Sequence, residues 1–177
     1  MNAEETLSPT AFISYVHGSA RHKQLVLDFA RLLQDHGVST TLDRWTTGRR
    51  KDWYQWIVAE MTRADFILPI ASKPYKAVFD GFAAGDKHRG TQAEAAVLRE
   101  LLYSDRPRWL PKILPVVLPG RSASEIPLVL QPNTVDHYPV PELTSAGAED
   151  LLRALTGQPK HMPPSLGTLP VLPPLTS

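Results

Sequence analysis

The sequence AFISYVHGSARHK, residues 11–23, predicts a β-strand that leads directly into a helix. Strand-forming side chains fill residues 12–16, and the Gly-Ser pair that follows ends the run. Ser19 is a suitable helix N-cap, and apolar residues at helical spacing continue towards Gly37, which favours a left-handed helix stop. A strand followed at once by a helix is the repeating unit of a parallel α/β sheet.

The rest of the chain continues this alternation of strands and helices. Further strands are predicted at residues 38–42, 65–71, 113–118 and 134–138. Further helices are predicted at residues 52–61, 92–103 and 146–155, while residues 72–90 show no clear pattern. Pro115 lacks an amide donor, which favours a place near the sheet edge for the fourth strand. The sequence therefore predicts an α/β fold with five parallel strands and helices on both faces.

The length and composition fit one folded domain with two flanking segments. A chain of 177 residues is long enough to bury a core without disulfides or metals. We expect a polar leader at residues 1–9, the domain at residues 10–157 and a proline-rich tail or linker at residues 158–177. A tail of this kind often leads to another domain, which would make this chain the front end of a longer protein.

The composition also narrows the class of protein. There is no cysteine, which excludes disulfides and favours a reducing compartment, so we expect a cytoplasmic protein. The six histidines show no metal-ligand spacing, and we expect no metal site. No run approaches the 18 apolar residues of a membrane span. The formal net charge of +1 argues against a protein that coats nucleic acid.

Glu94 is the strongest candidate for chemistry, and it also has a structural explanation. Thr91 and Glu94 fit a capping box, in which each side chain satisfies the backbone amide of the other at a helix start. The same carboxylate, at a helix N-terminus on the carboxyl edge of a parallel sheet, could stabilise an oxocarbenium-like transition state of glycosidic bond cleavage. Both roles remain open from the residues alone.

Residues 44–56 interleave arginine and lysine with tryptophan and tyrosine. The simplest interpretation is a helix anchored by two tryptophans, with its cations solvated. A protein-docking loop is the second interpretation, because tryptophan and arginine are common interface anchors. Stacking on single-stranded nucleic acid is the third and ranks last.

Five segments in this order resemble SEFIR domains, which are relatives of the TIR signalling domain. The resemblance begins with AFISYVHGSARHK and continues through LLQDHGVSTTLDRW, DWYQWIVAEM, ADFILPIASKPY and TQAEAAVLRELLY. It then runs through KILPVVLPG to LLRALTGQP and covers residues 10–159. The resemblance implies a flavodoxin-like fold, in agreement with the five parallel strands predicted above.

The resemblance also implies a function. SEFIR and TIR domains self-associate, and bacterial members resemble the front ends of multidomain proteins of antiphage immunity. In TIR relatives that are enzymes, a glutamate hydrolyses NAD to nicotinamide and ADP-ribose products, and Glu94 stands at the corresponding place. NAD is then the substrate, and no cofactor is expected. The chain is expected to be either an NAD hydrolase activated by assembly or a non-enzymatic interaction module.

The resemblance assigns further residues to these roles. The nucleotide pocket would be lined by Ser14, Tyr15, His17, Asp43, Arg44, Trp45, Ser72 and Tyr75. The segment predicted to dock against other copies contains Trp45, Arg49, Arg50 and Trp53. One residue departs from the family pattern, because Ala93 precedes Glu94 where bacterial SEFIR domains commonly have tryptophan.

Overall fold

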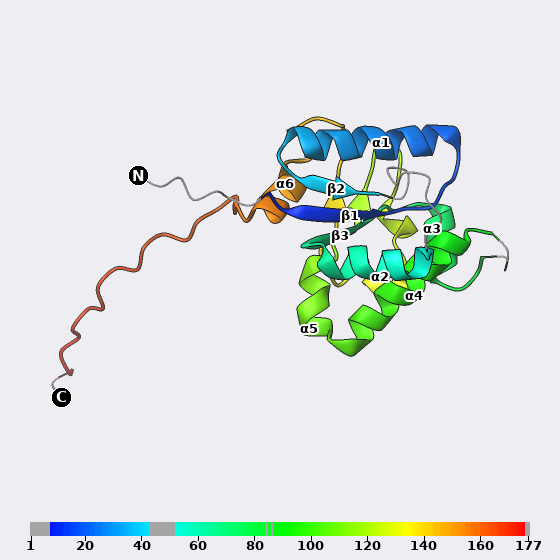
Figure 1. The fold of residues 1–177 in the computed structure, drawn as a ribbon. Coiled ribbons are helices and arrows are strands. Elements are labelled where there is room, and N and C mark those ends of the chain that lie inside the picture. Colours follow the sequence, from blue (N-terminus) through cyan, green and yellow to red (C-terminus); the bar gives the residue numbers. More distant parts are fainter. Residues whose placement is uncertain (1–7, 43–51, 84, 86, 176–177) are drawn as a thin grey trace.

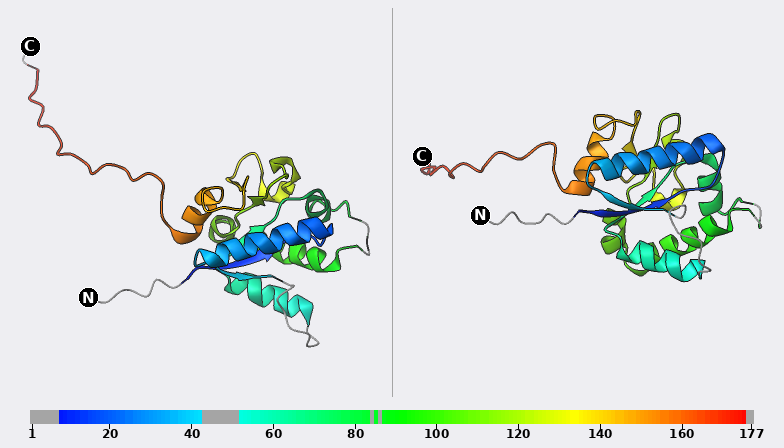
Figure 2. Two further views of the ribbon diagram at one scale, coloured as in Figure 1. Left: turned by 90° about the horizontal axis from the view of Figure 1, so that it is seen from above. Right: turned by 45° about the horizontal axis from the view of Figure 1, so that its top comes forward.

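The computed structural model consists of parallel strands between two layers of helices (Figure 1). It describes residues 8–42, 52–83, 85 and 87–175. Within these ranges, no helix combines the length and the apolar character needed to cross a membrane. Figure 2 shows the first helix lying along the strands on one side, while the C-terminal tail runs away from the domain.

Strands and helices alternate along the chain, as the sequence predicts. The strands are β1 (Thr10–Ser14), β2 (Ser39–Thr41), β3 (Phe66–Pro69), β4 (Val116–Val117) and β5 (Tyr138–Pro139). The helices are α1 (Ala20–Asp35), α2 (Trp53–Arg63), α3 (Lys73–Phe79), α4 (Arg89–Ser104), α5 (Arg106–Trp109) and α6 (Glu149–Thr156). Short 3₁₀ turns lie at Leu110–Lys112, Ala123–Glu125 and Leu128–Leu130.

The prediction of one continuous five-stranded sheet is confirmed only in part. β2, β1 and β3 form one parallel ladder in that order, and β4 and β5 form a second. Isolated parallel bridges join the two ladders: Ile67–Ile113 and Ile70–Val116. Pro69 lies between these bridges, and its backbone faces β4, as that of Ile67 and Ala71 does. It has no amide hydrogen to donate to β4, so the regular ladder is interrupted there.

The fourth strand lies near the edge of the strand layer, as Pro115 predicts, and the fifth strand differs from its predicted range. β4 is next to the edge strand, because it pairs with β5 on one side and bridges to β3 on the other. The proline is tolerated because its carbonyl still accepts the Tyr138 amide at 2.8 Å, and the β4–β5 ladder starts one residue later. The fifth strand starts only at the end of the predicted segment, because residues 132–134 form a turn.

Helix starts and stops follow local chemistry. Ser19 caps α1 by accepting the His22 amide on Oγ at 3.2 Å, and Gly37 takes a φ of 81° just past the helix end. Two helices were missed by the sequence pattern: α3, inside the unassigned residues 72–90, and α5. Both have a proline in the first turn, which is a helix-start signal that could have located them.

The two faces of the strand layer carry separate hydrophobic cores. Phe12 and Val16 belong to one core, whereas Ile13 and Tyr15 belong to the other, because successive side chains of a strand point to opposite faces. α2, α3, α4 and α5 pack on the Phe12 side, and α1 and α6 pack on the Ile13 side. In Figure 1, α1 lies above the strands and α2, α4 and α5 lie below them.

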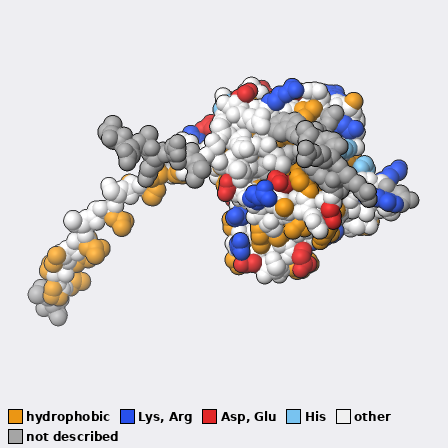
Figure 3. All heavy atoms as spheres, in the orientation of Figure 1, with side chains coloured by type: hydrophobic (Ala, Val, Ile, Leu, Met, Phe, Trp, Pro, Cys, Tyr) orange, Lys and Arg blue, Asp and Glu red, His pale blue; other side chains and the backbone are white. Residues whose placement is uncertain are grey.

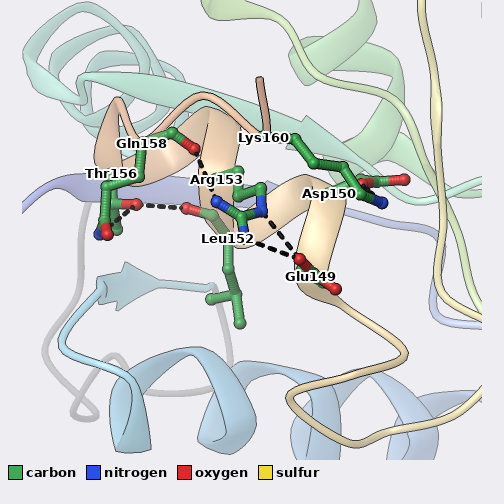
Figure 4. A network of polar contacts seen from close by, with 7 residues as sticks. All are labelled: Glu149, Asp150, Leu152, Arg153, Thr156, Gln158 and Lys160. Carbon is green, nitrogen blue, oxygen red and sulfur yellow. Dashed lines mark hydrogen bonds and ion pairs between the residues drawn. The ribbon is translucent and has the colours of Figure 1, made fainter. Parts of the chain in front are cut away.

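A small network of polar contacts joins α6 to the first residues of the C-terminal tail (Figure 4). Arg153 pairs with Glu149 at 2.8 Å and donates to the Gln158 carbonyl at 3.3 Å. Lys160 lies 3.5 Å from the Asp150 carboxylate. The described part of the tail beyond it has no helix or strand, and Figure 3 shows its apolar side chains away from the domain. The leader, domain and tail limits given above stay a prediction.

Candidate functional site

Ser14, at the carboxyl end of β1, is the first residue of the candidate site. Strand alternation places its side chain on the same face as Phe12, towards α3 and α4. α3 supplies Tyr75 and α4 supplies Glu94, so three elements far apart in sequence bring three polar side chains together. All three residues are buried, and Glu94 is only 7% exposed.

Hydrogen bonds connect the three side chains in a row. The Ser14 hydroxyl donates to Glu94 Oε2 at 2.5 Å, and the Ser14 and Tyr75 hydroxyl oxygens lie 2.9 Å apart. A serine hydroxyl has one hydrogen, which here points to Glu94, so Tyr75 is the donor to Ser14. The Glu94 carboxylate therefore accepts a charge-assisted hydrogen bond in the interior of the domain.

The Tyr75 hydroxyl keeps its proton at neutral pH. Burial raises the pKa of Tyr75 well above its usual value of 10.0, the hydrogen bond with Ser14 opposes this shift, and the Glu94 charge adds to it. The Tyr75 ring stacks on Phe79 with centroids 4.4 Å apart, which restricts its movement. Tyr75 is therefore a fixed, neutral donor that orients the Ser14 proton towards Glu94.

The predicted capping box at Thr91 and Glu94 is wrong. α4 begins at Arg89, and its N-cap is His88, in a left-handed conformation with φ 60° and no side-chain cap. The Thr91 hydroxyl instead donates to the Tyr15 carbonyl at 3.4 Å. Glu94 lies in the second turn of α4, beyond the free amides of the helix start, so capping does not explain its burial.

Ser72, another predicted pocket residue, lies between β3 and α3 and is the N-cap residue of α3. Its Oγ accepts the Tyr75 amide at 3.2 Å and so caps α3. The cap fixes the first turn of α3 and, with it, the position of the Tyr75 side chain. Ser72 thus supports the candidate site by positioning Tyr75.

The side chain of Tyr15 lies on the other side of β1. Its ring belongs to the core beneath α1 and packs on the ring of the exposed His17, with centroids 4.9 Å apart. The alternation that turns Ser14 towards Glu94 turns Tyr15 away from it. Of the first-strand residues predicted to line the pocket, the structure therefore brings Ser14 to Glu94 and places the Tyr15 ring in the opposite layer.

The second-loop residues of the prediction lie outside the described residues: Asp43, Arg44, Trp45, Arg49 and Arg50. Trp53, the docking residue that is described, opens α2 and is 51% exposed. Its ring meets Trp56 edge-on at 5.7 Å, and the neighbouring Tyr54 is 56% exposed. The first turn of α2 therefore presents two aromatic side chains to solvent.

The chemistry available at this site comes from the Glu94 carboxylate. Its charge is held in place by the Ser14 hydroxyl before any substrate binds. A charge oriented in this way can stabilise positive charge that develops on a substrate, because little reorganisation is needed during the reaction. Among the described residues, no group of three or more His, Cys, Asp or Glu side chains is placed to hold a metal ion.

Comparison with known proteins agrees with this architecture. The family model of the SEFIR domain matches residues 9–151, which is most of the chain. This chain belongs to the SEFIR family. SEFIR domains are TIR-related signalling domains and homotypic interaction modules.

A solved structure supports the SEFIR fold. The crystal structure of a prokaryotic SEFIR domain is 24% identical in sequence to this chain, with a TM-score of 0.65. The alignment covers 90% of this chain and 100% of that chain. No curated protein matches the sequence. At this level of sequence identity, the likeness concerns the fold alone.

Proposed function

We propose that this SEFIR domain, once self-associated, cleaves the N-glycosidic bond of NAD and releases nicotinamide and ADP-ribose products. The supporting observation is the buried Glu94 carboxylate, held at 2.5 Å by the Ser14 hydroxyl at the carboxyl end of β1. Ligands of open parallel sheets bind at this end of the strands. A role of this activity in antiphage defence is a further prediction from the family resemblance.

The bond that breaks joins the ribose C1′ to the nicotinamide nitrogen. As the bond lengthens, its electron pair moves to the nicotinamide ring, which leaves as a neutral molecule, and the ribose gains oxocarbenium character. The Glu94 carboxylate stabilises this positive charge. A water molecule then attacks C1′ and loses a proton to the carboxylate or to solvent, which gives ADP-ribose.

Ser14 and Tyr75 act as positioning residues in this proposal. A glutamate side chain on a helix has several rotamers, and the hydrogen bond from Ser14 selects one of them. Tyr75 fixes the direction of the Ser14 proton through its own hydrogen bond. Holding a reacting group in one geometry lowers the barrier, because that order does not have to be created during the reaction.

Incubation of concentrated protein with NAD, followed by an assay of free nicotinamide, tests the proposal. We expect the rate of release per molecule to rise with protein concentration, because the activity requires assembly. A rate per molecule that stays constant while the oligomeric state changes would contradict activation by assembly. No release from the assembled protein would contradict the proposal as a whole.

A non-enzymatic interaction module is the second candidate function, and the first turn of α2 favours it. Trp53 and Tyr54 are both more than half exposed there. Large exposed aromatic side chains are frequent anchors of protein interfaces. Arg49 and Arg50 precede them in the sequence and add charged groups of a kind common at interfaces.

Trp53→Ala is expected to weaken self-association by at least about tenfold, because truncation of an anchoring tryptophan costs about 2 kcal/mol or more. The fold should persist, since the side chain is half exposed and lies in the first turn of α2. Light scattering over a concentration series measures the association. Tyr103→Ala is the matched control, because Tyr103 is an exposed aromatic residue near the end of α4. Equal association of the wild type and Trp53→Ala would exclude this turn as the docking surface.

A further inference from the structure

A small cavity lies at the start of α1, on the opposite side of the strands from Glu94. Its volume is about 240 Å³. The first turn of α1 lines it with Ser19, Arg21 and His22, and the loop after β4 lines it with Arg121. The NAD cleavage proposed above uses none of these four residues, so this cavity is separate from the Glu94 site.

The helix end at this cavity favours negative charge. The first turn of α1 has no acidic residue to compensate the positive end of the helix dipole. The Ser19 hydroxyl accepts the His22 amide at 3.2 Å, and the Ser19 carbonyl accepts the Lys23 amide at 3.0 Å. This leaves two first-turn amides, those of Ala20 and Arg21, for an acceptor outside the helix.

Two arginine side chains add to the positive charge. Arg21 is exposed and forms no ion pair with a carboxylate of the described residues. Arg121 lies 3.8 Å from Glu125 Oε1, which is long for an ion pair, and its guanidinium has five N–H donors in total. Guanidinium groups bind phosphate oxygens through pairs of parallel N–H donors.

His22 is the independent indication that a ligand binds. It is 3% exposed and lines the cavity, yet neither ring nitrogen has a hydrogen-bond partner within the described ranges. Buried polar atoms are normally paired, and leaving them unpaired is costly. Burial lowers the pKa of His22, and the charge of Arg121 lowers it further, so the ring is neutral at pH 7.

We propose that this cavity binds a phosphate-type anion, either free phosphate or the phosphate of a larger molecule. The α1 amides, Arg21 and Arg121 donate to its oxygens. His22 lines the cavity, and one of its unpaired ring nitrogens donates a hydrogen bond to the anion once the ring has turned towards it. Sites for drug-sized molecules usually measure about 300–1,000 Å³, so this smaller cavity suits a phosphate group and not a whole nucleotide.

Thermal unfolding in the presence of inorganic phosphate tests the site. Phosphate at ten times its dissociation constant is expected to raise the melting temperature of the wild-type chain by about 3–5 °C. His22→Phe and Arg121→Gln are expected to lose most of this shift. Arg31→Gln should keep it, because Arg31 is an exposed residue of α1 that does not line the cavity. Phosphate also stabilises proteins in general, and the melting-temperature shift of Arg31→Gln measures that general effect together with binding at an intact cavity. NaCl is added to the phosphate-free samples so that the ionic strength is the same in all of them.

The variants separate anion binding from a purely structural role of His22. His22→Phe keeps a ring of similar size and removes two unpaired nitrogens, so without phosphate it should be at least as stable as the wild type. A phosphate shift of equal size in the wild type and both cavity variants would overturn the proposal, as would the absence of a shift in the wild type. AMP identifies the source: a larger His22-dependent shift with AMP indicates a nucleotide phosphate, and an equal or smaller one indicates free phosphate.

Discussion

Glu94→Gln is expected to lower NAD cleavage by about 100- to 1,000-fold, while the protein keeps its fold. Glutamine has the shape of glutamate, and its amide oxygen can still accept the Ser14 hydrogen bond. It lacks the negative charge that stabilises the developing charge on the ribose. The loss should appear mainly in kcat and not in KM, because that charge acts in the transition state.

Nicotinamide release measures the activity of Glu94→Gln, and circular dichroism with light scattering checks its fold and assembly. Glu100→Gln is the matched control, because Glu100 lies on the same helix and is exposed. This control should cleave NAD as the wild type does. If Glu94→Gln is folded, assembled and equally active, Glu94 is not the catalytic group. If neither the wild type nor the variants release nicotinamide, the interaction module remains the better proposal.

Tyr75→Ala is expected to lower the free energy of unfolding by about 3–5 kcal/mol, as large aromatic truncations in protein cores do. Tyr75 is fully buried and stacks on Phe79, so truncation leaves a cavity in the core between α3 and the strands. Tyr75→Phe removes only the hydroxyl and its bond to Ser14, and it is expected to cost about 0.5–1.5 kcal/mol.

Urea unfolding followed by circular dichroism measures both Tyr75 variants, and unchanged m values show that their unfolded states are comparable. Equal losses for the two variants would mean that the hydroxyl, and not the ring, carries the stability. Tyr75→Phe also tests the proposed positioning role. Its NAD cleavage should fall, because Ser14 loses the donor that directs its proton towards Glu94. An unchanged rate of NAD cleavage would mean that Tyr75 contributes to core packing and does not position Ser14 for the reaction.

Residues 11–37 show how much of this fold local chemistry decides. The strand, the Ser19 cap and the Gly37 stop were all predicted, and all are present in the structure. Each depends on groups only a few positions apart, such as the Ser19 hydroxyl and the His22 amide. The same holds for the alternation of strands and helices along the chain, which placed the protein in the α/β class.

The predictions that failed depend on groups brought together by packing. The regular ladder is interrupted between β3 and β4 because Pro69 lies between the two bridges and faces β4 without an amide hydrogen, and neither strand by itself reveals that register. Thr91 and Glu94 have the spacing of a capping box, yet α4 begins before Thr91. The tertiary bond from Thr91 to the Tyr15 carbonyl has no counterpart in a local pattern.

The α/β class, the SEFIR resemblance and the candidacy of Glu94 all follow from the residues alone. The neighbours of Glu94 do not, because they depend on how distant elements pack. Packing turns Ser14 towards the carboxylate and Tyr15 away from it, and it places Tyr75 where its hydroxyl orients that of Ser14. These hydrogen bonds join residues 61 and 80 positions apart, so they form only when β1, α3 and α4 come together.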